Sequence, residues 1–323
     1  MNMKRTWRYY RRLAALYGSY RRRDAVVAAP PLRLWLEISS RCNLRCPACP
    51  NKDLPAAQKG DMPWPLFRRV VDQAREFALE VNLHHRGETL LHPDAGRMAR
   101  YAAGAGLPCR LHTNATLLRG GVVGELLESG LQRLSVSFDG FDAATYEASR
   151  VGARFAEVRE NVVDFLERRR RARRRLPRVS LEVLEPAAGD DGERRRFAAD
   201  MAAHGLDELI VKKAHNWGGY LGAPPAGPVT ACTFPWNALL VLANGDVVPC
   251  AQDFFACLRL GSAVEAPLLE IWNGEPLQKL RRAFAARDLA GLPVCAACDR
   301  IRRPTMGGVP AEYLRRLLRR RMP

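Results

Sequence analysis

The sequence contains no apolar run long enough to cross a membrane and no apolar segment near its start that would form a secretory signal. The longest apolar run, around residues 238–243, is far shorter than the roughly 20 residues that a membrane helix needs. Acidic residues are also scarce, because 34 Asp and Glu stand against 51 Lys and Arg and leave a net charge of +17. We therefore expect a cytoplasmic protein with a strongly basic surface.

The basic excess has two interpretations: solvated helix surface, or attraction to an anionic partner such as a phosphorylated substrate, nucleic acid or an acidic membrane. The run Arg168–Arg175 closes a predicted helix, where cations complement the helix dipole. We therefore favour a solvated helix end there and do not expect nucleic-acid binding. The basic segments 1–24 and 311–321 leave peripheral contact with an anionic membrane, or with a lipid-linked substrate, as an alternative.

From residue 32 onward, short apolar runs alternate with amphipathic stretches of helical period. Such alternation predicts a parallel sheet with helices outside, since parallel crossovers need about that many residues. We expect an α/β fold, a partial (β/α)6 TIM-type barrel with its chemistry at the carboxyl ends of the strands. The predicted strands cover 32–38, 79–84, 108–112, 132–138, 179–184 and 206–212, and the predicted helices cover 63–77, 94–103, 117–129, 155–171 and 193–204.

The composition of the sequence changes after Gly218-Gly219, since residues 221–230 are rich in Pro, Gly and Ala. Beyond them, Asn244-Gly245 between two apolar runs predicts a β-hairpin. The predicted organisation is a basic arm (1–31), the barrel (32–220), a small auxiliary domain (221–310) and a basic terminal helix (311–323).

Nine cysteines in a reducing compartment indicate metal binding or catalysis rather than disulfides. Cys42, Cys46 and Cys49 follow the first predicted strand, spaced by three and then two residues. Three thiolates can hold a four-iron cluster and leave one iron open, as a catalytic metal requires.

In its context, Ser40-Arg41-Cys42-Asn43-Leu44-Arg45-Cys46-Pro47, this motif resembles that of the radical S-adenosylmethionine (SAM) superfamily. The resemblance covers about residues 32–220. It implies a [4Fe–4S] cluster on the three cysteines, SAM bound at the open iron, and reductive cleavage of SAM to a 5′-deoxyadenosyl radical. Ala48 departs from the larger residue that the family often has at that position.

Three later segments at predicted strand ends resemble SAM-binding motifs of the same family. They are His85-Arg86-Gly87-Glu88-Thr89, His112-Thr113-Asn114 and Ser135-Val136-Ser137-Phe138-Asp139-Gly140. The first departs from the family's Gly-Gly-Glu-Pro at Arg86 and Thr89. The resemblance implies contacts with SAM, its sugar or the substrate from Gly87, Glu88, Thr113, Asn114, Ser137 and Asp139.

A second set of cysteines comprises Cys232, Cys250, Cys295 and Cys298. Four cysteines can supply all the ligands of a zinc ion or of a [4Fe–4S] cluster. In this chain we favour the cluster. The segment resembles the carboxyl-terminal extension of the SPASM/twitch branch, in particular 2-deoxy-scyllo-inosamine dehydrogenase-type twitch enzymes. That resemblance implies one auxiliary [4Fe–4S] cluster that carries electrons.

Two cysteines lie outside both sets. Cys109, inside a predicted strand, is expected in the core. Cys257 has three interpretations: a buried small apolar residue, a cluster ligand in place of one of the four, or a hydrogen-atom donor to a substrate radical.

The predicted function is oxidation or rearrangement of a small polar substrate, of carbohydrate or aminocyclitol type. The positive net charge is compatible with an anionic substrate. A flavodoxin or ferredoxin would supply electrons, and the auxiliary cluster would accept the electron that the substrate loses. The candidate proton acceptors are Lys212, Lys213, Arg86 and His215. Two alternatives stay open: a sugar epimerase or dehydratase that uses Cys257, and a ribosomal-peptide maturase, which the short segment before the first strand disfavours.

Overall fold

The computed structural model describes residues 3–187, 189–224, 226–230, 232–307 and 309–311. The predicted basic terminal helix lies outside the described residues beyond Ala311. Within them, no helix is long and apolar enough to span a membrane.

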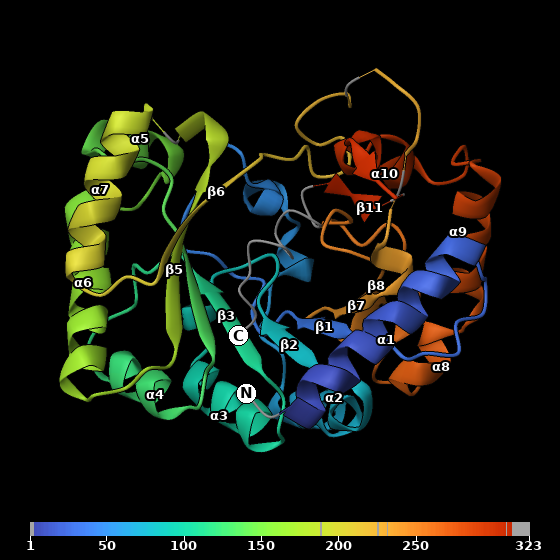
Figure 1. Cartoon of the computed structure of the whole chain (residues 1–323), viewed down its shortest axis with the longest axis horizontal. Helices are drawn as coiled ribbons and strands as arrows, with labels where there is room; N and C mark the ends of the chain where they lie inside the picture. Colours follow the sequence, from blue (N-terminus) through green and yellow to red (C-terminus); the bar gives the residue numbers. More distant parts are fainter. Residues whose placement is uncertain (1–2, 188, 225, 231, 308, 312–323) are drawn as a thin grey trace.

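Six parallel strands, each hydrogen-bonded to the next in chain order, form the main sheet. Their carboxyl ends share one edge, and Figure 1 shows helices around the outside, so the predicted partial (β/α)6 barrel is confirmed. The strands are β1 Arg33–Leu36, β2 Glu80–Leu83, β3 Cys109–Thr113, β4 Arg133–Ser137, β5 Arg178–Leu184 and β6 Glu208–Lys212. The helices of this part are α2 Trp64–Phe77, α3 Ala95–Gly104, α4 Gly121–Glu128, α5 Ala143–Ser149, α6 Phe155–Arg171 and α7 Asp191–Ala203.

Two of these helices differ from the sequence prediction. Helix α4 begins only at Gly121, because Gly120 has a positive φ of 61° that no right-handed helix contains. Helix α5 was not predicted. It is only seven residues long, and it begins where the Asp142 carboxylate accepts a hydrogen bond from the Thr145 amide at 2.9 Å.

The carboxyl-terminal segment extends the same sheet. Strand β7 (Ala238–Val241) pairs in parallel with β1, and β8 (Asp246–Val248) and β9 (Gly261–Ser262) follow in antiparallel order. The predicted hairpin is confirmed, with Gly245 at a φ of 94° in its turn. Around it lie α8 Leu268–Trp272, α9 Glu275–Ala286, α10 Pro293–Ala296 and the short pair β10 Thr305–Met306 and β11 Val309–Pro310.

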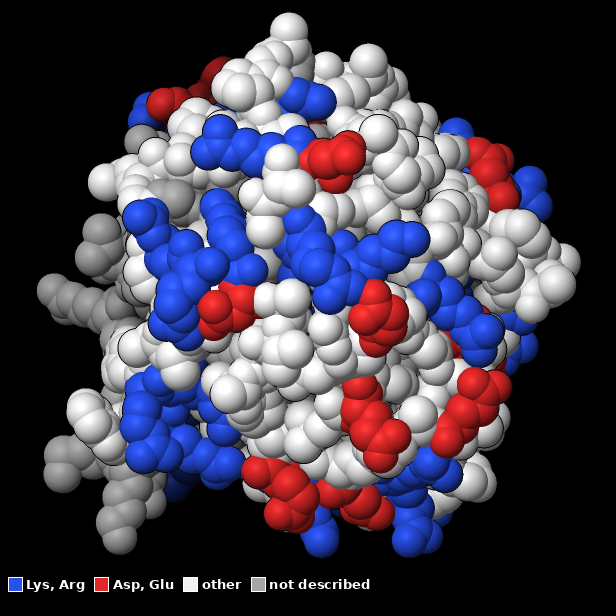
Figure 2. Space-filling model, turned by 90° about the vertical axis from the view of Figure 1, so that its right-hand side faces the viewer, with Lys and Arg blue, Asp and Glu red and all other residues white. Residues whose placement is uncertain are grey.

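The basic amino-terminal segment forms a single helix, α1 (Met3–Arg22). Its Leu16 and Tyr20 are buried in the continuous hydrophobic core that also contains Trp236 from the short helix η5 (Phe234–Trp236). Figure 1 shows α1 beside α9, and Figure 2 shows a band of basic side chains across this side of the molecule. The arm is therefore a packed part of the fold.

Candidate functional site

The loop after β1 brings the first three cysteines together. Burial raises the pKa of Cys42 to about 11 and also raises that of Cys49, and negative charge on the neighbouring thiols adds to both shifts. Such thiols ionise readily only beside compensating positive charge, which iron supplies. The donor set therefore fits an iron–sulfur cluster on Cys42, Cys46 and Cys49.

A close backbone contact holds this loop against the end of β2. The Glu88 amide donates to the Arg41 carbonyl at 2.7 Å. A Cβ atom on Gly87 would lie 2.4 Å from that carbonyl oxygen and 2.5 Å from the Ser39 carbonyl oxygen. Only glycine allows this approach, so Gly87 fixes the position of the residue that directly precedes Cys42.

The Glu88 side chain joins the ends of β2 and β3. Its buried carboxylate accepts hydrogen bonds from Thr113 Oγ1 and the Asn114 amide, each at 2.6 Å. Asn114 Nδ2 in turn donates to Asn43 Oδ1 in the cysteine loop at 3.0 Å. Four of the six predicted SAM-contact residues, Gly87, Glu88, Thr113 and Asn114, thus lie together around the cysteine loop.

Arg150, just after α5, links the end of β4 to the cluster loop. Its guanidinium pairs with the Asp139 carboxylate and also lies 3.9 Å from Cys46 Sγ. Asp139 additionally accepts from the Leu184 amide at 2.7 Å. Sequence reasoning missed Arg150, because a single arginine after a short helix carries no signal of its own.

A second polar cluster occupies the strand ends farther along the sheet. His112 Nε2 lies 2.6 Å from Ser137 Oγ, and His112 Nδ1 lies 3.6 Å from the Glu182 carboxylate. Lys212 forms an ion pair with Glu182, and the His84 ring lies 5.2 Å from the His112 ring. The placement of Ser137 agrees with a pocket role. Glu182 was missed, although an acidic residue within an apolar strand is an available signal.

Several buried polar atoms near these clusters have no hydrogen-bond partner within the described residues. They include His84 Nδ1, His85 Nε2 and Arg150 Nε. Buried polar groups nearly always have a hydrogen-bond partner. Buried polar atoms without one at the strand ends are therefore suited to bind a polar group of a ligand. The residues present therefore fit SAM and a polar substrate at this edge of the sheet.

The second set of cysteines converges under α9. Cys232, Cys250, Cys295 and Cys298 line one small cavity together with apolar side chains that include Phe284. Burial raises the pKa of all four, to about 12 for Cys250. No three His, Cys, Asp or Glu side chains of the described chain converge on a single-ion site. Four thiols around one cavity are the donor set that a [4Fe–4S] cluster takes.

Cys109 and Cys257 lie outside both groups. Cys109 is fully buried in β3, as predicted. Cys257 is exposed, so its interpretation as a buried apolar residue is wrong. Its amide donates to Asp253 Oδ1 at 2.8 Å, in the loop that also places Phe254 5.7 Å from the His85 ring.

The segment after β6 connects the two cysteine groups. Trp217 Nε1 donates to the Ala48 carbonyl at 2.9 Å, within the cluster loop. Asn216 Nδ2 donates to the Ala297 carbonyl at 2.7 Å, between the last two cysteines. His215 packs on Trp217 with ring centres 4.2 Å apart, and burial lowers its pKa to about 3. Lys213 is exposed and borders a separate hollow with Glu185 and Arg302.

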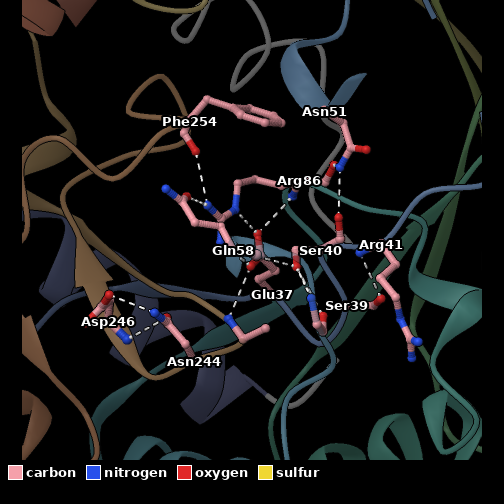
Figure 3. A network of polar contacts seen from close by, with 12 residues as sticks. Glu37, Ser39, Ser40, Arg41, Asn51, Gln58, Arg86, Asn244, Asp246 and Phe254 are labelled. Atoms are coloured by element: carbon pink, nitrogen blue, oxygen red, sulfur yellow. Dashed lines mark hydrogen bonds and ion pairs between the residues drawn. The ribbon is translucent and has the colours of Figure 1, made fainter. Parts of the chain in front are cut away.

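Arg86 lies in a buried ion pair. Its Nε donates to Glu37 at 2.7 Å, and the two side chains are 2% and 0% exposed. It also donates to Gln58 Oε1 at 3.0 Å and to the Phe254 carbonyl at 3.3 Å, as Figure 3 shows. A guanidinium offers only N–H donors, and those of Arg86 are engaged with these acceptors, so Arg86 is a poor proton acceptor. Its contacts instead join β1, the cluster loop and the carboxyl-terminal segment.

Arg86→Met would leave the Glu37 carboxylate buried without its partner. We expect a loss of about 3–5 kcal/mol in the free energy of unfolding of the metal-free protein, measured in urea under reducing, anaerobic conditions. The control is Arg171→Met, which removes an exposed pair with Glu167 and should cost below about 1 kcal/mol. An equal loss of unfolding free energy in both variants would contradict the stabilising role of the buried Arg86–Glu37 ion pair.

The half-buried imidazoles of His84 and His112 predict a pH dependence of stability. Burial lowers the pKa of His84 to about 3 and that of His112 to about 4, with Glu182 opposing and Lys212 and Arg150 adding to the shift at His112. The unfolded chain therefore binds more protons below about pH 6.5. The free energy of unfolding should fall as pH drops from about 6.5 to 4, and less steeply in His112→Gln. An unchanged slope would count against a neutral His112.

Two family models match the chain. The radical SAM superfamily model matches residues 36–180, and the SPASM model, an iron–sulfur cluster-binding domain, matches residues 232–299. The match agrees with the two regions in which the structure gathers its cysteines.

Similar proteins point the same way. The chain is 30% identical over 331 residues to PqqA peptide cyclase of Xanthomonas euvesicatoria, covering 89% of this chain and 85% of that protein. It is 23% identical to the S-adenosyl-L-methionine-dependent 2-deoxy-scyllo-inosamine dehydrogenase of Niallia circulans, covering 82% and 92%. By contrast, it spans only 36% of the AdoMet-dependent heme synthase of Methanosarcina barkeri, at 35% identity.

Among solved structures, BtrN in complex with AdoMet and 2-DOIA superposes with a TM-score of 0.60 at 20% identity, covering 84% of this chain and 93% of that one. This likeness shows a shared fold. Family models, full-length relatives and fold agree, and the chain belongs to the SPASM/twitch branch of the radical SAM superfamily, whose cofactors are SAM, a [4Fe–4S] cluster and auxiliary iron–sulfur clusters.

Proposed function

We propose that this enzyme oxidises a small polar substrate, of carbohydrate or aminocyclitol type, at a carbon that bears a hydroxyl group. The observation that carries the proposal is the cluster of His112, Ser137, Glu182 and Lys212 at the edge of the sheet that also holds the cysteine loop. Oxidation of an alcohol carbon needs a proton acceptor beside it, and this cluster offers one.

When bound, SAM and its cluster supply a radical that removes a hydrogen atom from the substrate. The protein's own residues complete the reaction. His112 is neutral near pH 7, because burial lowers its pKa to about 4, so Nε2 is available to accept the hydroxyl proton. Glu182 lies 3.6 Å from Nδ1 and would stabilise the imidazolium that forms. Lys212, tied to Glu182, would hold that carboxylate in place.

Electron removal is assigned to the second cysteine group. Four thiols can ligate all four irons of an auxiliary cluster, which then keeps no open corner for substrate and suits electron transfer. We propose Cys42, Cys46 and Cys49 as the ligands of the SAM-binding cluster, and Cys232, Cys250, Cys295 and Cys298 as those of the auxiliary cluster. SAM contacts are proposed for Gly87, Glu88, Thr113, Asn114, Ser137 and Asp139.

Peptide modification is the second candidate, supported by the 30% identity to PqqA peptide cyclase over most of both chains. A sugar epimerase with Cys257 as hydrogen donor is a third, supported by the exposed thiol in the loop that reaches His85. Product masses separate them. Oxidation of a sugar or cyclitol gives a product lighter by two hydrogens, whereas epimerisation in deuterated water gives a product of substrate composition with one deuterium. Conversion of peptides alone would overturn the small-molecule proposal.

Removal of two auxiliary ligands should separate the two clusters. Anaerobically reconstituted wild-type protein should hold about eight irons per chain, and Cys295→Ala/Cys298→Ala about four. The variant should still convert SAM to 5′-deoxyadenosine with dithionite but form no oxidised substrate. Cys257→Ser is the matched control and should keep all its iron. If Cys257→Ser also lost about four irons, the proposed ligand set would be wrong.

A further inference from the structure

We propose that the face formed by α1 and the end of α9 docks an acidic one-electron carrier protein, of flavodoxin or ferredoxin type, that exchanges electrons with the auxiliary cluster. The inference rests on the proposed role of that cluster as electron acceptor. It concerns a surface that the catalytic proposal does not use.

Helix α1 carries charge of one sign only. Its sequence, MKRTWRYYRRLAALYGSYRR, contains no acidic residue over 20 positions. Arg8, Arg11, Arg21 and Arg22 are exposed, and Trp7 among them is 69% exposed. On α9, Lys279 and Arg282 are exposed, and Arg287 follows its end. Figure 2 shows basic side chains in a band across this side of the molecule, with acidic side chains interspersed within, above and below it.

This basic face lies close to the auxiliary cysteines. Tyr20 of α1 packs on Trp236 with ring centres 5.4 Å apart, and Trp236 packs on Phe284 of α9 at 6.4 Å. Phe284 also lines the four-cysteine cavity. A continuous layer of aromatic side chains therefore separates the basic surface from the thiols.

The buried Arg281 fixes this layer. It is 0% exposed, donates to the Pro235 carbonyl at 2.9 Å and to the Ala25 carbonyl at 2.8 Å, and stacks on Trp272 at 4.4 Å. These contacts tie α9, η5 and the segment after α1 into one unit. The docking face is thus rigidly placed relative to the cavity.

The packing of α1 favours a protein partner over a membrane. An interfacial helix inserts its apolar face into the lipid, whereas the apolar Leu16 and Tyr20 of α1 are committed to the core. A positively charged surface that keeps Trp7 and Tyr17 exposed is suited to a negatively charged protein. Because this face lies beside the four-cysteine cavity, an electron carrier is the negatively charged protein that we expect to bind there.

The carrier also balances the reaction. Each oxidation takes a hydrogen atom from the substrate and then one proton and one electron. The electron passes to the auxiliary cluster, which must lose it before the next turnover. The oxidised carrier takes up this electron by outer-sphere transfer, with no bond made or broken.

The test compares two charge-reversal variants of the reconstituted holoenzyme. Arg8→Glu/Arg11→Glu/Arg21→Glu alters the proposed face. Arg170→Glu/Arg174→Glu/Arg175→Glu makes the same change of charge at exposed positions around the end of α6, on the opposite side of the molecule. Binding of a purified acidic flavodoxin and of an acidic [2Fe–2S] ferredoxin is measured by anaerobic calorimetry at low and at 0.3 M salt, and electron exchange by stopped-flow absorbance.

We expect wild-type affinity for at least one carrier to fall with salt, and the α1 variant to lose at least about tenfold in affinity and electron-exchange rate. The α6 variant should match wild type. SAM cleavage driven by dithionite should be equal in all three proteins, so its failure would point to the catalytic proposal instead. The docking proposal is overturned if neither carrier binds at low salt, if both variants bind equally well, or if the α1 variant loses only binding to phosphatidylserine vesicles or duplex DNA.

Discussion

The position of the cysteine loop depends on one backbone contact, between this loop and the end of β2. The Arg41 carbonyl lies where a side chain on residue 87 would have to be, and it accepts the Glu88 amide. Because Arg41 precedes Cys42, this contact sets how the first thiol enters the site. Glu88 then carries the constraint to β3 through Thr113 and Asn114. The carboxyl ends of three strands are therefore positioned by one glycine and one buried carboxylate.

The same region binds the carboxyl-terminal segment to the barrel. Strand β7 continues the sheet beside β1, and Arg86 reaches from the end of β2 to Glu37 and to the Phe254 carbonyl. Trp217 and Asn216 form the opposite link, between the cluster loop and the last pair of cysteines. The two cysteine groups thus belong to one framework, as the proposed transfer of an electron from the substrate to the second group requires.

Much of this arrangement could be predicted from the sequence, because spacing and periodicity report local structure. The cysteine spacing, the strand ends and the hairpin at Asn244-Gly245 are all local signals. The roles of Arg86, Glu182 and Arg150 are not, since each depends on partners distant in the chain. Arg86 was a candidate base because it stands in a motif, yet Glu37, 49 residues earlier, engages it in a buried pair. Likewise the packing of α1 depends on Trp236, which no amino-terminal pattern reveals.

The central claim is that the loop of Cys42, Cys46 and Cys49 holds a [4Fe–4S] cluster with one iron open to SAM. Electron paramagnetic resonance of the dithionite-reduced, anaerobically reconstituted protein tests it most directly. The account predicts a [4Fe–4S]⁺ signal whose g-values shift on addition of SAM, with 5′-deoxyadenosine formed in the same sample. A signal that SAM leaves unchanged, together with no 5′-deoxyadenosine, would contradict it.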